Sequence, residues 1–262
     1  MSEHIQPPTV LIIAGNDPSG GAGLSADIQA VTALGAHPAP VVSALTVQDT
    51  MDVRQVEVIS PQLVIAQAKA VLEDQPVAAI KLGLLGSVAV GEAVTQLLHQ
   101  WSGIPLVVDP VLVASGGGAL AEADLIRIYL EQLLPLAGLA TPNAAESRRL
   151  VPSATDAAGR AAALLDAGCR HVLLKGADEV TPDVRNTLFS ADGNHEEFIW
   201  PRLPGSYHGS GCTLASAIAA LLAHGKSMHD AVAEAQRFTW DALQQGWRPG
   251  KGQTIPGRWT HR

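Results

Sequence analysis

The sequence predicts an α/β fold with one mostly parallel central sheet flanked by helices. Short apolar runs rich in β-branched residues alternate with longer helical patterns along the chain, which is typical of βαβ units. With 47% hydrophobic and 16% charged residues, the chain can bury a large core. Its 262 residues exceed the usual domain of about 150, but α/β folds of this size are often one unit. We therefore expect a single domain over residues 1–262, with residues 1–8 and about 247–262 as tails.

The order of the elements follows from the hydrophobic pattern. Six short apolar runs are predicted to be buried strands, at residues 10–14, 40–44, 77–81, 106–108, 136–140 and 171–175. Stretches with helical spacing lie between them, at residues 24–34, 61–73, 88–101, 123–134, 144–150 and 155–167. Residues 184–190 and 196–200 form a predicted extended pair around the turn Asp192-Gly193-Asn194. Helices at 212–224 and 228–245 follow, and the Pro- and Gly-containing residues 246–262 are predicted to be loop or disorder.

Composition argues against several classes of protein. The formal net charge is -8 and no Lys/Arg cluster is present, so nucleic acid is not an expected partner. No apolar run approaches the roughly 18 residues of a membrane span, and residues 1–8 lack the pattern of a signal peptide. Cys169 and Cys212 are too few for a disulfide framework and have no metal-ligand spacing. We expect a cytoplasmic protein.

Polar residues beside Gly or Pro follow five of the predicted strands. In a parallel sheet the carboxyl ends of the strands meet at one rim, and ligands bind outside that rim. The chain places Asn, Asp or Lys there repeatedly, at residues 15–23, 81–83, 109–110, 141–143 and 175–176. This repetition is hard to attribute to folding alone and predicts a ligand site at the rim.

Each of these signals also has a purely structural explanation. The Gly-rich residues 20–23 can be a tight connection, and they match neither a dinucleotide fingerprint nor a P-loop. Asp109 can cap a turn, and Lys175 can end a strand in solvent. Asn143 and Glu146 have the spacing of a capping box. A carboxylate at a helix start can also reach a hydrated magnesium ion, so the two roles of Glu146 are compatible.

The segment His208-Gly209-Ser210-Gly211-Cys212-Thr213 is predicted to bind a phosphate group. Glycines let the backbone bring N–H groups close to a ligand, and the Ala- and Leu-rich helix that follows adds the positive end of its dipole. The same dipole is expected to favour a thiolate at Cys212.

Three interpretations of Cys212 are open from the residues alone. It can be a small residue that packs at a helix start, or it can form a nucleophile pair with His208, as in thiol hydrolases. We favour a third, in which the Cys212 thiol and the N–H groups of Gly209, Ser210, Gly211 and Cys212 meet a transferring phosphoryl group.

Several segments, taken in chain order, resemble the hydroxymethylpyrimidine/phosphomethylpyrimidine kinases of thiamine biosynthesis. They lie at residues 14–23, 26–27, 44–50, 81–85, 108–111, 141–146, 174–176 and 208–213, so the resemblance covers about residues 10–245. It implies the ribokinase-like three-layer α/β fold. It also implies ATP-dependent phosphorylation of 4-amino-5-hydroxymethyl-2-methylpyrimidine and then of its monophosphate.

The resemblance also implies roles for individual residues. Gly15, Asp27 and Gln48 would hold the pyrimidine, and Leu84 would add an apolar contact. A carboxylate and a carboxamide can satisfy the donor and the ring acceptors of an aminopyrimidine.

At the other end of the site, Lys175 would neutralise nucleotide phosphates beside Asn143, Gly209 and Gly211. Asp109 and Glu146, with Asn143, would organise Mg²⁺ and its waters. The resemblance further allows for a monovalent cation and implies a homodimer.

The chain departs from the family pattern at a few positions. Tyr207 replaces a common Thr and could narrow the nucleotide side of the site, Ser210 replaces a frequent Thr, and Leu84 replaces a frequent Met. Relatives that act on sugars or pyridoxal usually carry Asp where Cys212 stands, which weighs against those substrates. The alternatives are a kinase of pyridoxal or a related ring alcohol, and a non-catalytic pyrimidine-sensing module of the same fold.

Overall fold

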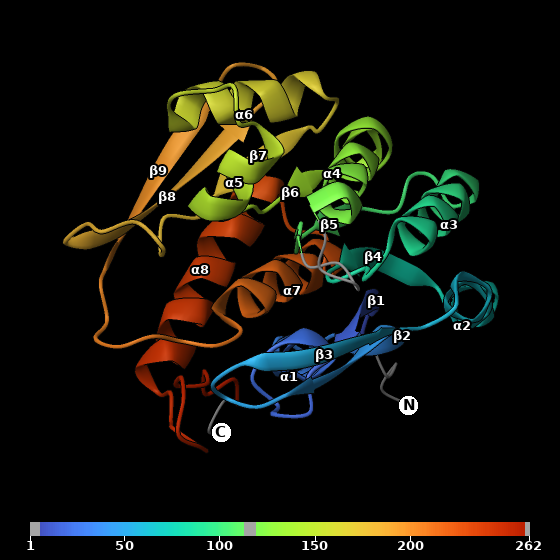
Figure 1. Cartoon of the computed structure of the whole chain (residues 1–262), viewed down its shortest axis with the longest axis horizontal. Helices are drawn as coiled ribbons and strands as arrows, with labels where there is room; N and C mark the ends of the chain where they lie inside the picture. The colour runs from blue at the N-terminus through green and yellow to red at the C-terminus, as the bar shows by residue number, and fades with distance from the viewer. Residues whose placement is uncertain (1–5, 113–118, 260–262) are drawn as a thin grey trace, which may run out of the picture.

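A computed structural model describes residues 6–112 and 119–259, and its centre is a nine-stranded sheet (Figure 1). The spatial order is β3-β2-β1-β4-β5-β6-β7-β8-β9. The strands are β1 (Thr9–Asn16), β2 (His37–Gln48), β3 (Val53–Val58), β4 (Val77–Leu82), β5 (Leu106–Val108), β6 (Leu139–Ala140), β7 (His171–Leu174), β8 (Asp183–Ser190) and β9 (His195–Pro201). The central strands from β2 to β7 pair in parallel, whereas β3, β8 and β9 are antiparallel to their neighbours.

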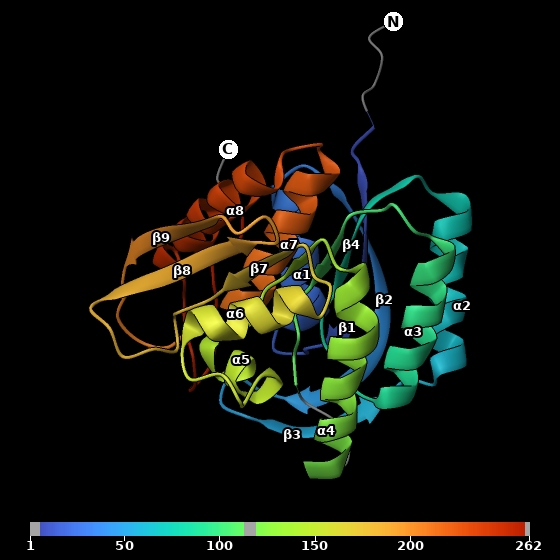
Figure 2. The ribbon, with the colours of Figure 1, turned by 90° about the horizontal axis from the view of Figure 1, so that it is seen from above.

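Helices cover both faces of the sheet and complete the three layers (Figure 2). One layer contains α1 (Gly23–Ala33), α7 (Ser210–Ala223) and α8 (Met228–Gln244). The other contains α2 (Pro61–Asp74), α3 (Val88–Gln100), α4 (Ala119–Ile128), α5 (Ala144–Leu150) and α6 (Ala157–Asp166). Strand β1 serves both layers, because Val10 and Ile12 pack toward α7 while Leu11 and Ile13 pack toward the opposite layer. Burial on both faces explains why this strand has an unbroken apolar sequence.

The predicted mostly parallel α/β architecture is confirmed, with three local differences. Strand β3 was not predicted, because its sequence Val-Arg-Gln-Val-Glu-Val is largely exposed and lacks a clean alternation. The predicted helix at 123–134 is interrupted, since α4 passes into a π-helical turn (Tyr129–Leu133) and then a 3-10 turn (Leu134–Leu136). Those turns shorten the predicted strand 136–140 to Leu139–Ala140.

Residues 247–259, part of a segment predicted to be loop or disorder, have no helix or strand but are packed. Trp247 pairs with Ile255 and Tyr207 pairs with Thr254 through isolated backbone bridges. The side chains of Ile255 and Arg258 are 3% and 1% exposed. Packing against the domain therefore orders residues 247–259 without regular secondary structure. In the described part of the chain, none of the helices is long and apolar enough to span a membrane.

Candidate functional site

The carboxyl ends of the parallel strands converge on the start of helix α7. The backbone N–H of Asp109, after β5, donates to Leu82 at the end of β4, at 2.9 Å. Beyond β6 and β7, Asn143 and Lys175 form a backbone bridge. The strand order therefore brings the predicted rim residues 81–83, 109, 143 and 175 to one edge of the sheet.

Lys175 and Asp109 form a buried ion pair at this edge. Lys175 Nζ lies 2.8 Å from Asp109 Oδ1, and the Thr141 hydroxyl donates to the same oxygen at 3.0 Å. Burial raises the pKa of Asp109, but the ammonium groups of Lys175 and Lys81 outweigh burial and hold it below its usual value. A Cβ built on Gly211 would lie 3.0 Å from Lys175 Nζ, so the ammonium is adjacent to the first turn of α7. The explanation in which Lys175 ends a strand in solvent is therefore wrong.

Asn143 and Glu146 form the capping box that their spacing predicts. Asn143 Oδ1 accepts from the Glu146 backbone N–H at 2.7 Å, and Glu146 Oε2 accepts from the Asn143 N–H at 2.8 Å. Burial raises the pKa of Glu146 to about 7, with Lys175 lowering it and the Asp109 carboxylate raising it further. Two carboxylates that repel one another in a buried place favour a cation between or beside them.

The predicted phosphate loop begins α7 at a left-handed glycine. Gly209 has φ of 81° and is the N-cap of the helix. A Cβ at Gly209 would overlap the carbonyl oxygen of Gly21, so the phosphate loop lies directly against the Gly-rich loop that follows β1. Both the backbone angle and this close approach require glycine at position 209.

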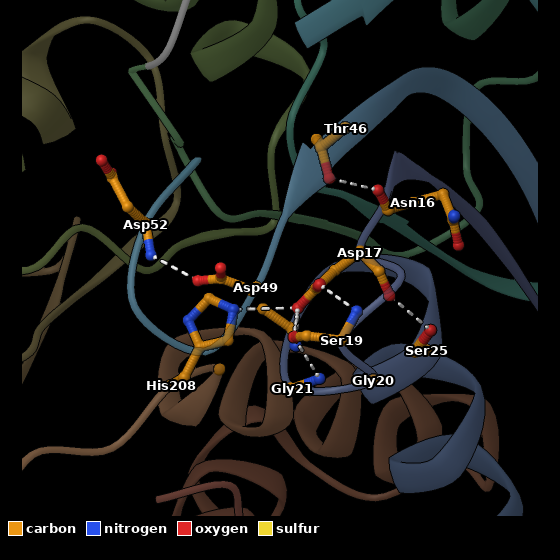
Figure 3. A network of polar contacts seen from close by, with 12 residues as sticks. Asn16, Asp17, Ser19, Gly20, Gly21, Ser25, Thr46, Asp49, Asp52 and His208 are labelled. Carbon is orange, nitrogen blue, oxygen red and sulfur yellow. Dashed lines mark hydrogen bonds and ion pairs between the residues drawn. The ribbon is translucent and has the colours of Figure 1, made fainter. Parts of the chain in front are cut away.

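Asp17 ties the two loops together through His208 (Figure 3). His208 Nε2 lies 2.8 Å from Asp17 Oδ2, and that carboxylate also accepts from the backbone N–H groups of Ser19 and Ala22 at 2.8 and 2.7 Å. Burial raises the pKa of Asp17, but these hydrogen bonds outweigh it and lower the pKa to about 2. Because the Nε2 of His208 is engaged by Asp17, the structure gives no support to a Cys212–His208 nucleophile pair.

Cys212 is a half-buried free thiol in the first turn of α7. Burial raises its pKa to about 11; Lys81 lowers it, whereas Asp27 and Asp109 raise it. The expectation of a thiolate at Cys212 is therefore wrong for this structure, because burial and the Asp27 and Asp109 carboxylates raise the pKa of the thiol.

The four residues expected to hold the pyrimidine occupy different environments. Gly15 and Leu84 are in contact, since a Cβ on Gly15 would lie 2.8 Å from Leu84 Cδ2. Gln48 is half-buried and is the last residue of β2. Two residues earlier in the same strand, the Thr46 hydroxyl donates to the Asn16 carbonyl at 2.9 Å (Figure 3). Asp27 has no exposed surface and is already paired within the protein.

The partner of Asp27 is Lys81, to which the sequence reasoning assigned no role. Lys81 Nζ lies 2.9 Å from each oxygen of Asp27, and the Ser216 hydroxyl donates to Oδ1 at 2.7 Å. A lysine inside the apolar strand Val-Ala-Ala-Ile-Lys-Leu is the sequence signal, because a buried ammonium needs a partner.

A cavity of about 470 Å³ opens beside the phosphate loop. Lys175, Ser210 and Gly211 are among its lining residues. Tyr207, which the family resemblance led us to expect on the nucleotide side of the site, lines the cavity as well. Other lining residues come from β8, β9 and α8, including Asn186, Trp200, Gln236 and Trp240.

Gln236 is one of the buried polar side chains that line this cavity, together with Asn186 and Thr239. Its Oε1 accepts from Asn186 Nδ2 at 2.8 Å and from Trp200 Nε1 at 3.2 Å. Its Nε2 has no hydrogen-bond partner within residues 6–112 and 119–259. Sequence reasoning named none of these residues, because they belong to three elements with no shared motif.

Two comparisons of the sequence with known proteins agree on one family. The sequence model of a family described as phosphomethylpyrimidine kinase matches residues 17–256. The chain is 39% identical over 254 residues to a hydroxymethylpyrimidine/phosphomethylpyrimidine kinase of Streptomyces coelicolor, which covers 95% of this chain and 93% of the relative. It is also 39% identical over 252 residues to a thiamine biosynthesis bifunctional protein of Geobacter sulfurreducens, covering 93% of this chain and 51% of that protein. The chain thus spans about half the length of the bifunctional relatives it matches.

The fold also matches a solved kinase. A pyridoxal kinase of Staphylococcus aureus, in complex with AMP-PCP and pyridoxal, superposes with a TM-score of 0.87 and 26% identity. The match covers 97% of this chain and 94% of the other. The predicted ribokinase-like three-layer fold and the resemblance to the pyrimidine kinases are both confirmed.

Proposed function

Because the chain belongs to the phosphomethylpyrimidine kinase family, we propose that it transfers the γ-phosphoryl group of ATP to 4-amino-5-hydroxymethyl-2-methylpyrimidine. A second transfer, to the resulting monophosphate, gives the pyrophosphate used in thiamine biosynthesis. The observation that carries this proposal is the position of the Lys175 ammonium beside the first turn of α7, in the lining of the cavity. Backbone N–H groups and a buried cation at one point stabilise a transferring phosphoryl group.

ATP is proposed to lie along the cavity, with its phosphates at Lys175 and Gly209–Cys212. The base then lies toward Trp200 and Gln236, whose unpartnered Nε2 is a donor suited to a ring nitrogen. The Staphylococcus aureus kinase of this fold was solved with the ATP analogue AMP-PCP.

Magnesium fits the carboxylates Asp109 and Glu146. Burial raises the pKa of Glu146, and the Asp109 carboxylate raises it further. A divalent cation beside both carboxylates would favour their ionised forms. When bound, the ion would neutralise phosphate charge; the chain's own part is to hold Asp109 with Lys175 and Thr141 and to hold Glu146 in the capping box.

For the pyrimidine, we propose that Gly15 and Leu84 contact the ring and that Gln48 hydrogen-bonds to it. Asp27 is proposed to act with Lys81 as a buried ion pair at this end of the site. Lys81 and Ser216 already donate hydrogen bonds to the Asp27 carboxylate. The carboxylate can therefore accept a hydrogen bond from the pyrimidine only with a lone pair that these two residues do not use.

The two transfers make different demands on Cys212. An alcohol must lose a proton as it attacks, whereas a phosphate monoester is largely ionised near neutral pH. We therefore propose that Cys212 assists the first transfer. Since burial keeps its thiol protonated, the N–H groups of Gly209–Cys212 and Lys175 are proposed to contribute more to catalysis in both steps.

An ATP-coupled assay on three substrates tests the function: the pyrimidine alcohol, its monophosphate and pyridoxal. Turnover of the alcohol and the monophosphate is expected. Turnover of pyridoxal alone would favour the ring-alcohol kinase alternative, to which the pyridoxal kinase neighbour belongs. Tight binding of the pyrimidine without ADP formation would instead favour the sensing module.

We further propose a homodimer and a cytoplasmic location. The β2–β3 hairpin exposes several apolar side chains on one segment, Leu45, Val47, Met51 and Val53, as interfaces between subunits do. Analytical ultracentrifugation of the wild type and of Val47→Asp tests the dimer: a monomeric wild type would contradict it.

A further inference from the structure

We propose that Arg258 is a positioning residue for phosphoryl transfer, holding the phosphate loop (residues 209–213) against the Gly-rich loop (residues 20–23). The effect of Arg258 on catalysis depends on the kinase function proposed above. Arg258 is not among the residues that line the cavity, and its hydrogen bonds within the described residues go to Thr213, Gly20, Gly21 and Gln29. It lies in the segment 247–259, which has no helix or strand.

The guanidinium of Arg258 donates to both loops at once. Its Nε donates to the Thr213 hydroxyl at 2.7 Å, on the phosphate-loop side. Its Nη1 donates to the Gly20 carbonyl at 3.4 Å and to Gln29 Oε1 at 3.1 Å, and its Nη2 donates to the Gly21 carbonyl. A planar, rigid fork of donors fixes the distance between its acceptors better than a flexible ammonium does.

Two of these contacts lead directly to Gly209. The Thr213 hydroxyl that accepts from Arg258 donates to the Gly209 carbonyl at 2.7 Å. The Gly21 carbonyl that accepts from Arg258 is the atom against which Gly209 is packed. Arg258 thus holds Gly209, the N-cap of α7, in two ways. It acts through Thr213 on the phosphate-loop side and through Gly21 on the side of the Gly-rich loop. The orientation of the first N–H groups of α7 follows from this residue.

In the described part of the chain, the charge of Arg258 is buried without a carboxylate at ion-pair distance. Among residues 6–112 and 119–259, Arg258 makes no ion pair within 4.0 Å, and Asp17 and Asp27 act on it at longer range. Burial lowers its pKa to about 10, so it is still protonated near neutral pH. A buried cation held by neutral dipoles leaves a positive potential behind the phosphate loop, where a phosphoryl group would be attracted.

Backbone hydrogen bonds on the N-terminal side of Arg258 fix the position of its side chain. The Gly257 N–H donates to the Ala242 carbonyl at 2.8 Å. Thr254 pairs with the chain beside the phosphate loop, accepting from the His208 N–H at 2.9 Å and donating to Ser206 at 3.0 Å. The segment that carries Arg258 is therefore attached to the loop that Arg258 positions.

The test compares Arg258→Met and Arg258→Lys with Arg248→Met, an exposed arginine of the same segment. We expect Arg258→Met to lower kcat about 10- to 100-fold, because small misplacements of catalytic groups have effects of this size. KM for ATP should change by less than about threefold, and Arg258→Lys should restore part of kcat. Arg248→Met should match the wild type. A wild-type kcat in Arg258→Met, or a rise in KM with kcat unchanged, overturns the proposal.

Hydrogen exchange of the ligand-free protein separates this proposal from the proposed function. Amides 209–213 should exchange faster in Arg258→Met than in Arg248→Met, while those of β7 stay unchanged. Faster exchange in a chain that shows no kinase activity supports the positioning role and refutes the function; unchanged exchange refutes the positioning role. If Arg258→Met does not fold, Thr213→Val provides a second test, because it removes only the hydroxyl that connects Arg258 to Gly209. This variant should show the same fall in kcat and the same faster exchange. A wild-type kcat or unchanged exchange in Thr213→Val would refute the proposal.

Discussion

Lys81 Nζ lies at equal distance, 2.9 Å, from the two carboxylate oxygens of Asp27, and neither side chain has any exposed surface. The pair connects β4 in the sheet to α1 in the layer beside it. Because Ser216 of α7 also donates to Asp27, the pair joins the two predicted ends of the site, the pyrimidine end and the phosphate end.

Breaking this pair should strongly destabilise the fold. Lys81→Met leaves the Asp27 carboxylate buried without its cation, which is expected to lower the free energy of unfolding by about 3–5 kcal/mol. Lys226→Met, which breaks the exposed pair with Glu234, should lower it by less than about 1 kcal/mol. Urea denaturation measures the free energy of unfolding of both variants. Equal losses of stability would contradict the claim that burial makes the Lys81–Asp27 pair important. The double variant Lys81→Met/Asp27→Leu should recover part of the stability, because no uncompensated charge remains.

Glu146 should make stability depend on pH in a defined window. Its pKa is about 7 in the folded protein against 4.5 as the ordinary value. Between these values the folded protein retains a proton that the unfolded chain has lost. The free energy of unfolding therefore falls as pH rises from 4.5 to 7, by at most about 1.4 kcal/mol per pH unit.

Glu146→Gln should remove that part of the pH dependence while preserving the helix cap, since glutamine also completes a capping box. Denaturation at a series of pH values, on both proteins, measures the difference. An identical slope in the variant and the wild type would show that Glu146 does not titrate in this window.

The sequence predicted the fold well where the signal is local. The buried strand β1 is an unbroken apolar run and α7 follows a Gly-rich start, so both were identified from short stretches. Strand β3 was missed because its exposure removes the apolar pattern, and its place is fixed by antiparallel pairing with β2.

The sequence predicted the site residues that lie in recognisable motifs, but it did not predict the roles of residues whose contacts are made far along the chain. Lys81 pairs with a residue 54 positions away, and Arg258 donates to a residue 45 positions away, so no spacing reveals either contact. The protonation of Cys212 was predicted from the helix start alone, but burial and carboxylates from other elements set it. These contacts and this protonation state depend on packing between residues far apart in the chain, which the sequence pattern does not show.

Cys212→Ala should slow the first transfer more than the second. Only the thiolate of Cys212 can accept the proton of the alcohol, and burial keeps most of this thiol protonated near neutral pH. Loss of the thiolate is therefore expected to lower alcohol phosphorylation by about 100-fold, the low end of the range for general bases. Phosphorylation of the monophosphate should fall by less than about tenfold, because that nucleophile is already ionised. The two rates are measured separately with ATP in excess. Equal losses for both substrates would exclude an assignment of Cys212 as the base.

Gly211→Ala should impair catalysis without unfolding the protein. The new Cβ would lie 3.0 Å from Lys175 Nζ and 3.8 Å from Asp109 Oδ2, in the space proposed for the transferring phosphate. The backbone of Gly211 has no positive φ, and alanine favours helix, so the fold should keep its melting temperature.

We expect kcat/KM for ATP to fall about 10- to 100-fold in Gly211→Ala, because the phosphate is displaced from the N–H groups of α7. Gly138→Ala is the matched control, since a Cβ there meets no atom closer than 3.5 Å and lies at the start of β6, away from the rim. Steady-state kinetics and thermal denaturation of the three proteins distinguish the outcomes. Full activity of Gly211→Ala would place the phosphate elsewhere, whereas a lowered melting temperature in proportion to the lost activity would mean that the loss reflects unfolding.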